Sequence, residues 1–167
     1  MELSPWIEIG VGFAAALLVG TLAEYVMHRL MHAGKVLHKV HAKHHQTGQA
    51  QGWLGEFRDY FLPSIPILPA GFLFSIDAGI GFAVGGTIYA MWAAYAHQVQ
   101  HEKPELVFWL RQPVHHLHHH HKMWRHNFGI SVSIWDHVFG TYKKCEWAPE
   151  KRPYQHSLAS YFHIKWF

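Results

Sequence analysis

Two long runs of apolar residues separate the hydrophobic from the polar segments of the chain. Ser4 and Pro5 are typical of a helix N-cap and a first helical position, and the apolar pattern then continues to Ala33, ahead of Gly34. A second run extends over residues 78–101. As helices the two segments would measure about 43 Å and about 36 Å, which exceeds the roughly 30 Å of a bilayer's apolar core. The pattern predicts two membrane-spanning helices whose last turns reach the headgroup region.

Small residues recur at four-residue spacing in both runs. The first run contains Gly12, Ala16 and Gly20, and the second contains Gly81 and Gly85. In membrane helices this spacing allows two backbones to approach closely. We expect these faces to mediate close helix packing.

A third apolar stretch, residues 61–76, is interrupted by Pro63, Pro66 and Pro69. Proline removes a backbone donor and distorts a helix. We expect a proline-bent returning element, preceded by a polar connection over residues 46–60. The predicted fold is all-α: an integral membrane bundle of about three hydrophobic helices, one of them proline-bent, with a helical cap.

Basic residues indicate how the helices are oriented. Four follow the first run, two follow the second, and none lies in the turn near Asp77: Arg29, Lys35, Lys39, Lys43, Lys103 and Arg111. The positive-inside rule therefore places the C-terminal ends of both long helices, and the cap that follows them, at the cytoplasmic face.

Composition agrees with membrane contact and excludes several classes of protein. Half of the residues are hydrophobic and 15% are charged, where a soluble domain has about 25% charged residues. The net charge is +3, but the basic residues flank apolar runs instead of forming a nucleic-acid-binding stripe. The single cysteine, Cys145, excludes an internal disulfide, a cysteine-based zinc site and an iron–sulfur cluster. Because no Lys or Arg precedes the first run and no cleavage site follows it, we expect that run to remain in the mature protein.

The chain contains 18 histidines, and ten of them form a duplicated pattern. A pair at four-residue spacing is followed by an HxxHH triplet, and the same arrangement then recurs: His28, His32, His41, His44 and His45, then His97, His101, His116, His119 and His120. Residues four apart on a helix share one face, so each pair can approach one metal ion. Ten neutral imidazoles are enough for two metal ions with positions left for oxygen or water.

Other residues near the pattern leave alternatives open. The triplet His115, His118 and His119 also satisfies HxxHH, so the register of the last triplet is ambiguous. Five further histidines could complete a metal shell, hydrogen-bond to it or face solvent: His38, His115, His118, His121 and His126. Glu24, one turn before His28, could orient that imidazole or be an ordinary helix-end carboxylate.

The ordered boxes resemble those of the membrane-bound fatty acid hydroxylase and sterol desaturase superfamily. The four boxes are residues 28–32, 41–45, 97–101 and 116–120, and the segments 127–136 and 139–142 resemble the sequence that follows the last box. The resemblance covers roughly residues 20–145. It implies a single membrane domain over residues 1–167, with hydrophobic helices at about 5–27, 61–76 and 78–97, histidine boxes at 28–45 and 97–120, and a C-terminal interfacial segment at 127–167.

The resemblance also implies a non-haem di-iron centre that uses O2 and two electrons on a lipid C–H bond. A fatty acyl lipid is the favoured substrate, with carotenoid and sterol substrates as alternatives, and hydroxylation or desaturation as the outcome. Zinc could replace iron in purified protein. An external cytochrome or ferredoxin, with its reductase, would supply electrons. Asn127 and Asp136 match the family segment, and we expect them to brace the last box.

Two other classes of function use the same residues. A histidine-rich membrane protein could bind or transport metal, although transport favours polar ligands inside the span, whereas these histidines lie at or beyond its end. A bis-histidine haem protein is the third alternative, and a haem absorption band would identify it. The sequence does not indicate the oligomeric state.

Overall fold

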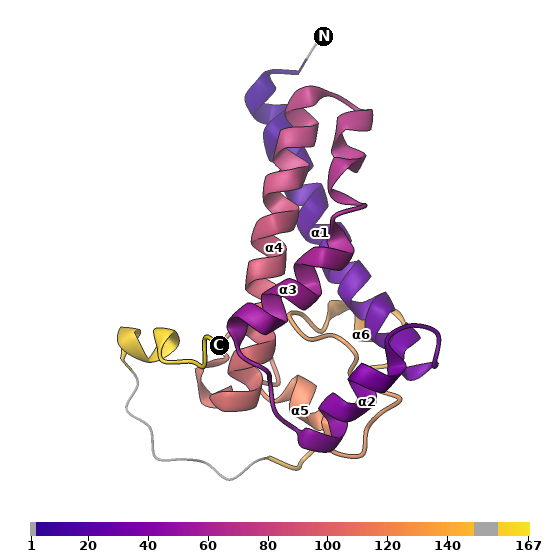
Figure 1. Ribbon diagram of the computed structural model, residues 1–167, viewed down its shortest axis with the longest axis vertical. Helices are drawn as coiled ribbons and strands as arrows, with labels where there is room; N and C mark the ends of the chain where they lie inside the picture. The colour runs from indigo at the N-terminus through magenta and orange to yellow at the C-terminus, as the bar shows by residue number, and fades with distance from the viewer. Residues whose placement is uncertain (1–2, 149–156) are drawn as a thin grey trace.

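The computed structural model describes residues 3–148 and 157–167, and within them all regular structure is helical (Figure 1). The α-helices are α1 (Pro5–His32), α2 (His38–Thr47), α3 (Trp53–Ser64), α4 (Ile76–Glu102), α5 (His115–His120) and α6 (Ile134–Val138). Three 3₁₀ helices complete the described elements: η1 (Leu68–Leu73), η2 (Pro104–Leu106) and η3 (Leu158–Phe162). The prediction of an all-α fold is confirmed.

Helices α1 and α4 lie side by side and run in the same direction, so both C-terminal ends reach the same end of the molecule (Figure 1). Glycines create the contact surface. A side chain added at Gly12 would collide with the carbonyl of Ala78, and one added at Gly81 with the carbonyl of Ile9. Gly85 lies as closely against Phe13. Of the small residues predicted to mediate close packing, Gly12, Gly81 and Gly85 therefore lie where the two backbones meet, whereas Gly20 lies against the Tyr89 ring.

We expect Gly81→Leu to destabilise the pair, because the new side chain must push the α1 backbone away. Overpacking a tight contact costs about 1–3 kcal/mol, and a backbone neighbour cannot move aside as a side chain can. Gly10→Leu is the matched control, since nothing lies within 4 Å of a side chain built at Gly10. Thermal unfolding in detergent should show a lower midpoint for Gly81→Leu alone. Equal midpoints would contradict this packing.

Both long helices have the length and apolar character of membrane spans. In their most hydrophobic segments only 11% of α1 and 39% of α4 is buried inside the described structure. Large apolar side chains instead point outward, including Trp6, Val11 and Leu18 on α1 and Val84 and Ile88 on α4. A soluble protein rarely exposes apolar patches of this extent. Lipid contact accounts for them, and we treat the protein as a membrane protein.

The prediction of a third hydrophobic helix over residues 61–76 is wrong in its extent. Helix α3 begins at Trp53, inside the segment expected to be a polar connection, and ends at Ser64 after Pro63; a turn and the short helix η1 follow. The stretch therefore turns back along α4 as a broken element (Figure 1). Prolines prevent one continuous helix. Trp53, Phe57 and Phe61 stack at four-residue spacing along α3, which packs against α4, and the indole N–H of Trp53 donates to the Met91 carbonyl on α4.

The C-terminal segment closes the structure below α4. Ile164 packs with Val99, Leu106, Val107 and Leu110 in a buried apolar core. The backbone N–H groups of residues 53 and 54 donate to the carbonyls of residues 165 and 166, at 2.8 and 3.0 Å. The predicted interfacial segment 127–167 thus divides into residues 127–148, which wrap the histidine-rich region, and residues 157–167, which brace α3 and α4; residues 149–156 lie outside the described part.

Candidate metal centre

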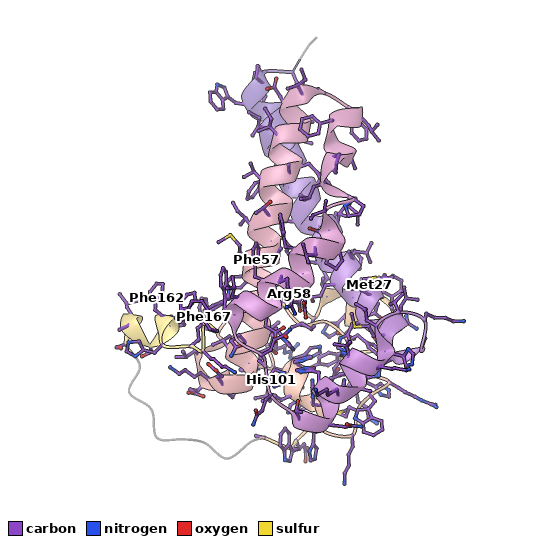
Figure 2. The ribbon with its side chains drawn as sticks, in the orientation of Figure 1. Met27, Phe57, Arg58, His101, Phe162 and Phe167 are labelled. Atoms are coloured by element: carbon purple, nitrogen blue, oxygen red, sulfur yellow. The ribbon has the colours of Figure 1, made fainter. Side chains whose placement is uncertain are left out.

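The ends of α1 and α4 and the short helices α2 and α5 bring the ten patterned histidines together below the apolar helices (Figure 2). Five form the first histidine cluster: His28, His32, His41, His45 and His119. Four form the second histidine cluster: His44, His97, His101 and His116. In each cluster the ligand atoms lie within 4.8 Å of one another. The tenth, His120, has its Nε2 3.1 Å from that of His116 and its ring stacked 4.0 Å from His45, between the clusters.

The Nε2 atoms of these imidazoles face one another. In the first cluster the Nε2 of His32 lies 2.9 Å from that of His41 and 2.8 Å from that of His119. In the second cluster the Nε2 atoms of His44 and His97 are 3.1 Å apart. Ring nitrogens from several helices therefore converge on two points. This is the arrangement expected of side chains that bind a common ligand.

The opposite ring nitrogens show which tautomer is present. The Nδ1–H groups of His28, His44, His101 and His119 donate to backbone carbonyls at 2.6, 3.1, 3.2 and 2.6 Å. A carbonyl can only accept, so the proton lies on Nδ1 and the Nε2 lone pair points into the cluster. The buried Nε2 atoms of His28 and His101 have no hydrogen-bond partner. Lone pairs aimed at each other repel unless a cation lies between them, so the donor set fits metal ions.

Burial keeps the three histidines of the box over residues 41–45 neutral. Burial, together with the neighbouring imidazoles, lowers the pKa of His41 to about 2, of His44 to about 3 and of His45 to about 4. At neutral pH these rings therefore carry no proton on the ligating nitrogen. A metal ion would not have to displace protons from them, as it does from exposed imidazoles.

The five histidines between residues 115 and 120 point in two directions. His116, His119 and His120 face the clusters, whereas the Nε2 of His115 donates to Asp136 at 2.9 Å and that of His118 to the Trp147 carbonyl at 2.5 Å. The other three histidines that could have completed a metal shell also lie outside both histidine clusters. His121 stacks on the Trp147 ring, His38 is exposed at the start of α2, and His126 contributes only its carbonyl, to His119.

Two polar side chains, Asp136 and Asn127, hold the loop after α5 in place. The sequence predicts that both brace the last histidine box. The fully buried Asp136 accepts hydrogen bonds from the backbone of Phe128 and Gly129, both at 2.8 Å. Asn127 has a positive φ of 58° and bonds the backbone of Lys143 in both directions. These bonds fix the carbonyl of Phe128, which in turn orients His28.

Glu24 acts on the same loop and does not contact His28. Its carboxylate accepts hydrogen bonds from the backbone N–H groups of Ile130 and Ser131, at 2.8 and 3.0 Å, and from the Tyr89 hydroxyl at 2.9 Å. The Nδ1–H group of His28 donates to the carbonyl of Phe128 and not to Glu24. Glu24 thus reaches His28 only through the backbone of the loop.

The sequence interpretation missed two residues that hold the second cluster. Glu56 accepts a hydrogen bond from the Nδ1 of His97 at 2.6 Å and is 4% exposed. The fully buried Gln100 accepts from the backbone N–H of His116 and donates to the carbonyl of Ile130. Neither has a signal in the local pattern, because each partner lies far away in the chain.

We expect Glu56→Gln to weaken metal retention in the second cluster by about 10–100-fold, the usual effect of removing a carboxylate behind a ligating histidine. Burial raises the pKa of Glu56, but the adjacent His97 imidazole and the hydrogen bonds that the carboxylate accepts from His97 and from the backbone of Gln51 lower the pKa more, so the group is ionised. Its charge would strengthen the ligating nitrogen. Asp59→Asn is the control, since that carboxylate is exposed and bonds Arg58 and Gln51. Metal content during titration with a chelator measures the effect, and identical curves for the two variants would contradict it.

Comparisons with known proteins place the chain among fatty acid hydroxylases. A family model described as fatty acid hydroxylase matches residues 13–141. The chain is 29% identical over 153 residues to a dihydroceramide fatty acyl 2-hydroxylase from Arabidopsis thaliana, covering 80% of this chain and 61% of the relative. It is 27% identical over 150 residues to a fatty acid 2-hydroxylase from Rattus norvegicus, covering 77% and 38%.

This chain therefore matches less than two thirds of the length of either relative. No solved structure was found to match it. The family match nevertheless extends over most of the chain and includes all ten patterned histidines and the loop that braces them. The chain belongs to the fatty acid hydroxylase family.

Proposed function

We propose that the protein is a membrane-bound non-haem di-iron oxygenase that hydroxylates a lipid C–H bond. The observation that carries the proposal is the pair of adjoining histidine clusters with inward-facing Nε2 atoms. The first and second clusters would each hold one iron ion, with His120 between them. Two bound iron ions would activate O2, so that one oxygen atom enters the C–H bond and the other leaves as water with two electrons and two protons.

The residues of the chain prepare the site for that chemistry. Ten neutral imidazoles bring no negative charge, so they leave the charge of bound metal uncompensated and the centre strongly electrophilic. Backbone carbonyls on Nδ1 hold His28, His44, His101 and His119 in the ligating tautomer. Glu56, behind His97, is the one anion bonded to a ligand among the residues that the structure describes.

A fatty acyl chain is the substrate that we favour. Both relatives are named for 2-hydroxylation of a fatty acid or fatty acyl group. The clusters lie at the end of the apolar helices, where a lipid head group and the first acyl carbons would be found. We infer hydroxylation at carbon 2, next to the carbonyl. Carotenoid or sterol substrates remain the alternatives within the superfamily.

The position of the centre also favours an electron donor on the cytoplasmic side of the membrane. The basic residues after both helices favour a cytoplasmic histidine face. With one cysteine, this chain cannot hold a cysteine-bound iron–sulfur cluster. Electrons would therefore come from a separate cytochrome or ferredoxin. Zinc would fill the same sites but carry no redox chemistry, so iron content must be measured.

Lipid mass spectrometry under ¹⁸O₂ tests the proposal. Cells would express the wild type, His41→Ala/His97→Ala with one change in each cluster, or the control His38→Ala/His121→Ala outside both clusters. We expect labelled 2-hydroxyacyl lipid from the wild type and the control only. A new unlabelled double bond would indicate a desaturase. Metal uptake without oxygen consumption would indicate transport, and either result would overturn the proposal.

A further inference from the structure

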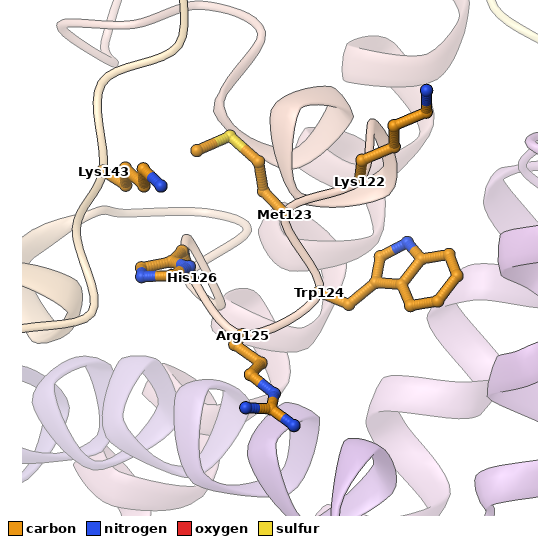
Figure 3. Close-up of a pocket in the computed structure, with 6 residues that line it drawn as sticks. All are labelled: Lys122, Met123, Trp124, Arg125, His126 and Lys143. Carbon is orange, nitrogen blue, oxygen red and sulfur yellow. The ribbon is translucent and has the colours of Figure 1, made fainter.

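A cleft opens at the surface beside the first histidine cluster. Figure 3 shows the residues that line one of its two recesses. The cleft consists of two adjoining recesses, of about 450 and about 440 Å³, that share Trp124 and Arg125. The second recess also contains His32, a member of the first cluster, and Arg29 from the last turn of α1. At this cleft the outer surface comes close to the ring nitrogens of the first cluster.

The lining of this cleft is basic. Arg29, Lys122, Arg125 and Lys143 are all exposed, and no acidic side chain lines either recess. Within residues 3–148 and 157–167 the ion pairs involve other residues, so these four cations have no carboxylate partner. The sequence itself contains no Asp or Glu over residues 29–55 or 106–135. The surface is thus complementary to an anionic partner.

An exposed aromatic ring connects the cleft with the histidines. The Trp124 side chain is 59% exposed, and its ring centroid lies 6.4 Å from that of His45. Its indole N–H donates to the carbonyl of His120 at 3.3 Å. One side chain therefore touches both the surface and two histidines of the candidate centre. Electron transfer slows steeply with distance, so a path this short favours entry here.

We propose that the basic cleft is the docking surface for the electron donor, an acidic one-electron redox protein, and that electrons enter through Trp124. The inference rests on the proposed hydroxylase function. Each turnover would oxidise two donor molecules by one electron each, while two solvent protons and one oxygen atom leave as water. Small, charge-steered contacts are typical of electron-transfer partners, which must dissociate quickly. A negatively charged head group of a membrane lipid is the competing occupant.

Reduction kinetics of the iron-loaded protein test the docking surface directly. The protein would be placed in phosphatidylcholine nanodiscs and mixed with reduced plant-type ferredoxin or with a soluble acidic b-type cytochrome. We expect Arg125→Glu to lower the second-order reduction rate about 10–100-fold at low salt, and less at high salt. Arg111→Glu is the matched control, because it makes the same charge change at an exposed position outside the cleft.

Substitutions of Trp124 test the path. Trp124→Leu should lower the reduction rate at saturating donor, and Trp124→Phe should restore most of it, because an aromatic ring again reaches toward His45. Reduction by dithionite, a small donor that needs no docking surface, should be the same in all variants. Iron content, measured in parallel, verifies that the centre is intact.

The outcomes separate this inference from the function on which it rests. A wild-type centre that dithionite cannot reduce would overturn the proposed function. Normal reduction by dithionite, combined with equal donor rates for Arg125→Glu and wild type, or with no reduction by either acidic donor, would overturn the docking surface. An Arg125→Glu defect that appears only when phosphatidylglycerol is added would assign the cations to lipid head groups instead.

Discussion

Replacement of His119 by alanine is expected to remove metal from the first cluster and to lower hydroxylation more than roughly 100-fold, since even a partner behind a ligating histidine is worth 10–100-fold. His119 is fully buried, with its Nε2 2.8 Å from that of His32 and its Nδ1 held by the His126 carbonyl. Iron per chain and turnover should fall together. The metal should fall from two ions to about one, because the second cluster has its own ligands.

The adjacent His118 provides a stringent control. It is 2% exposed, belongs to the same short helix and points to the Trp147 carbonyl. His118→Ala therefore removes an equally buried imidazole without touching either cluster, and we expect it to keep both metal ions. His119 belongs to both possible registers of the last box, so His118 distinguishes them: if His118→Ala lost metal and His120→Ala kept it, the alternative register would be correct.

The spacing of the boxes predicted which histidines converge, and the reason is local. Four-residue spacing puts two rings on one helix face whatever the rest of the fold does. The register of the last box could not be predicted, because both triplets in residues 115–120 have the same spacing. Contacts formed elsewhere in the chain distinguish them: Asp136 bonds His115, and the Trp147 carbonyl bonds His118.

The same distinction between local sequence patterns and distant contacts explains which parts of the fold could be predicted. The long apolar runs predicted α1 and α4 within a few residues, because a hydrophobic helix of that length needs no partner to specify it. The third helix was predicted from apolar content alone. Its regular part lies earlier, where Trp53 and Phe57 alternate with polar residues and form an apolar face. Glu56, on that missed helix, was missed with it, since its partner His97 is 41 residues away.

The loop over residues 127–142 positions histidines of the candidate metal centre, and the carboxylate of Asp136 holds this loop in place. The carboxylate accepts from the backbone of Phe128 and Gly129, from the Thr141 hydroxyl at 2.7 Å and from His115. Burial raises the pKa of Asp136, but these hydrogen bonds outweigh it and leave the pKa below its usual value. The Asp136 carboxylate is therefore an anion at neutral pH, and these hydrogen-bond donors stabilise its buried charge.

Asp136→Ala is therefore expected to destabilise the protein by about 3–5 kcal/mol, because buried donors lose their acceptor together. For a chain of this size that corresponds to a fall of roughly 6–20 °C in the unfolding midpoint. Asp59→Ala is the control, because its pair with Arg58 is exposed to solvent and contributes little to stability. Thermal unfolding in detergent, followed by circular dichroism, measures both.

Asp136→Asn distinguishes a bracing residue from one that takes part in acid–base chemistry. The amide keeps the size and one acceptor oxygen but turns an N–H group toward backbone donors, so stability should fall between wild type and Asp136→Ala. Metal content should fall with it, since the Phe128 carbonyl that orients His28 moves when the loop loosens. A variant with wild-type stability and iron content but no turnover would instead show that the Asp136 carboxylate is needed in the reaction itself.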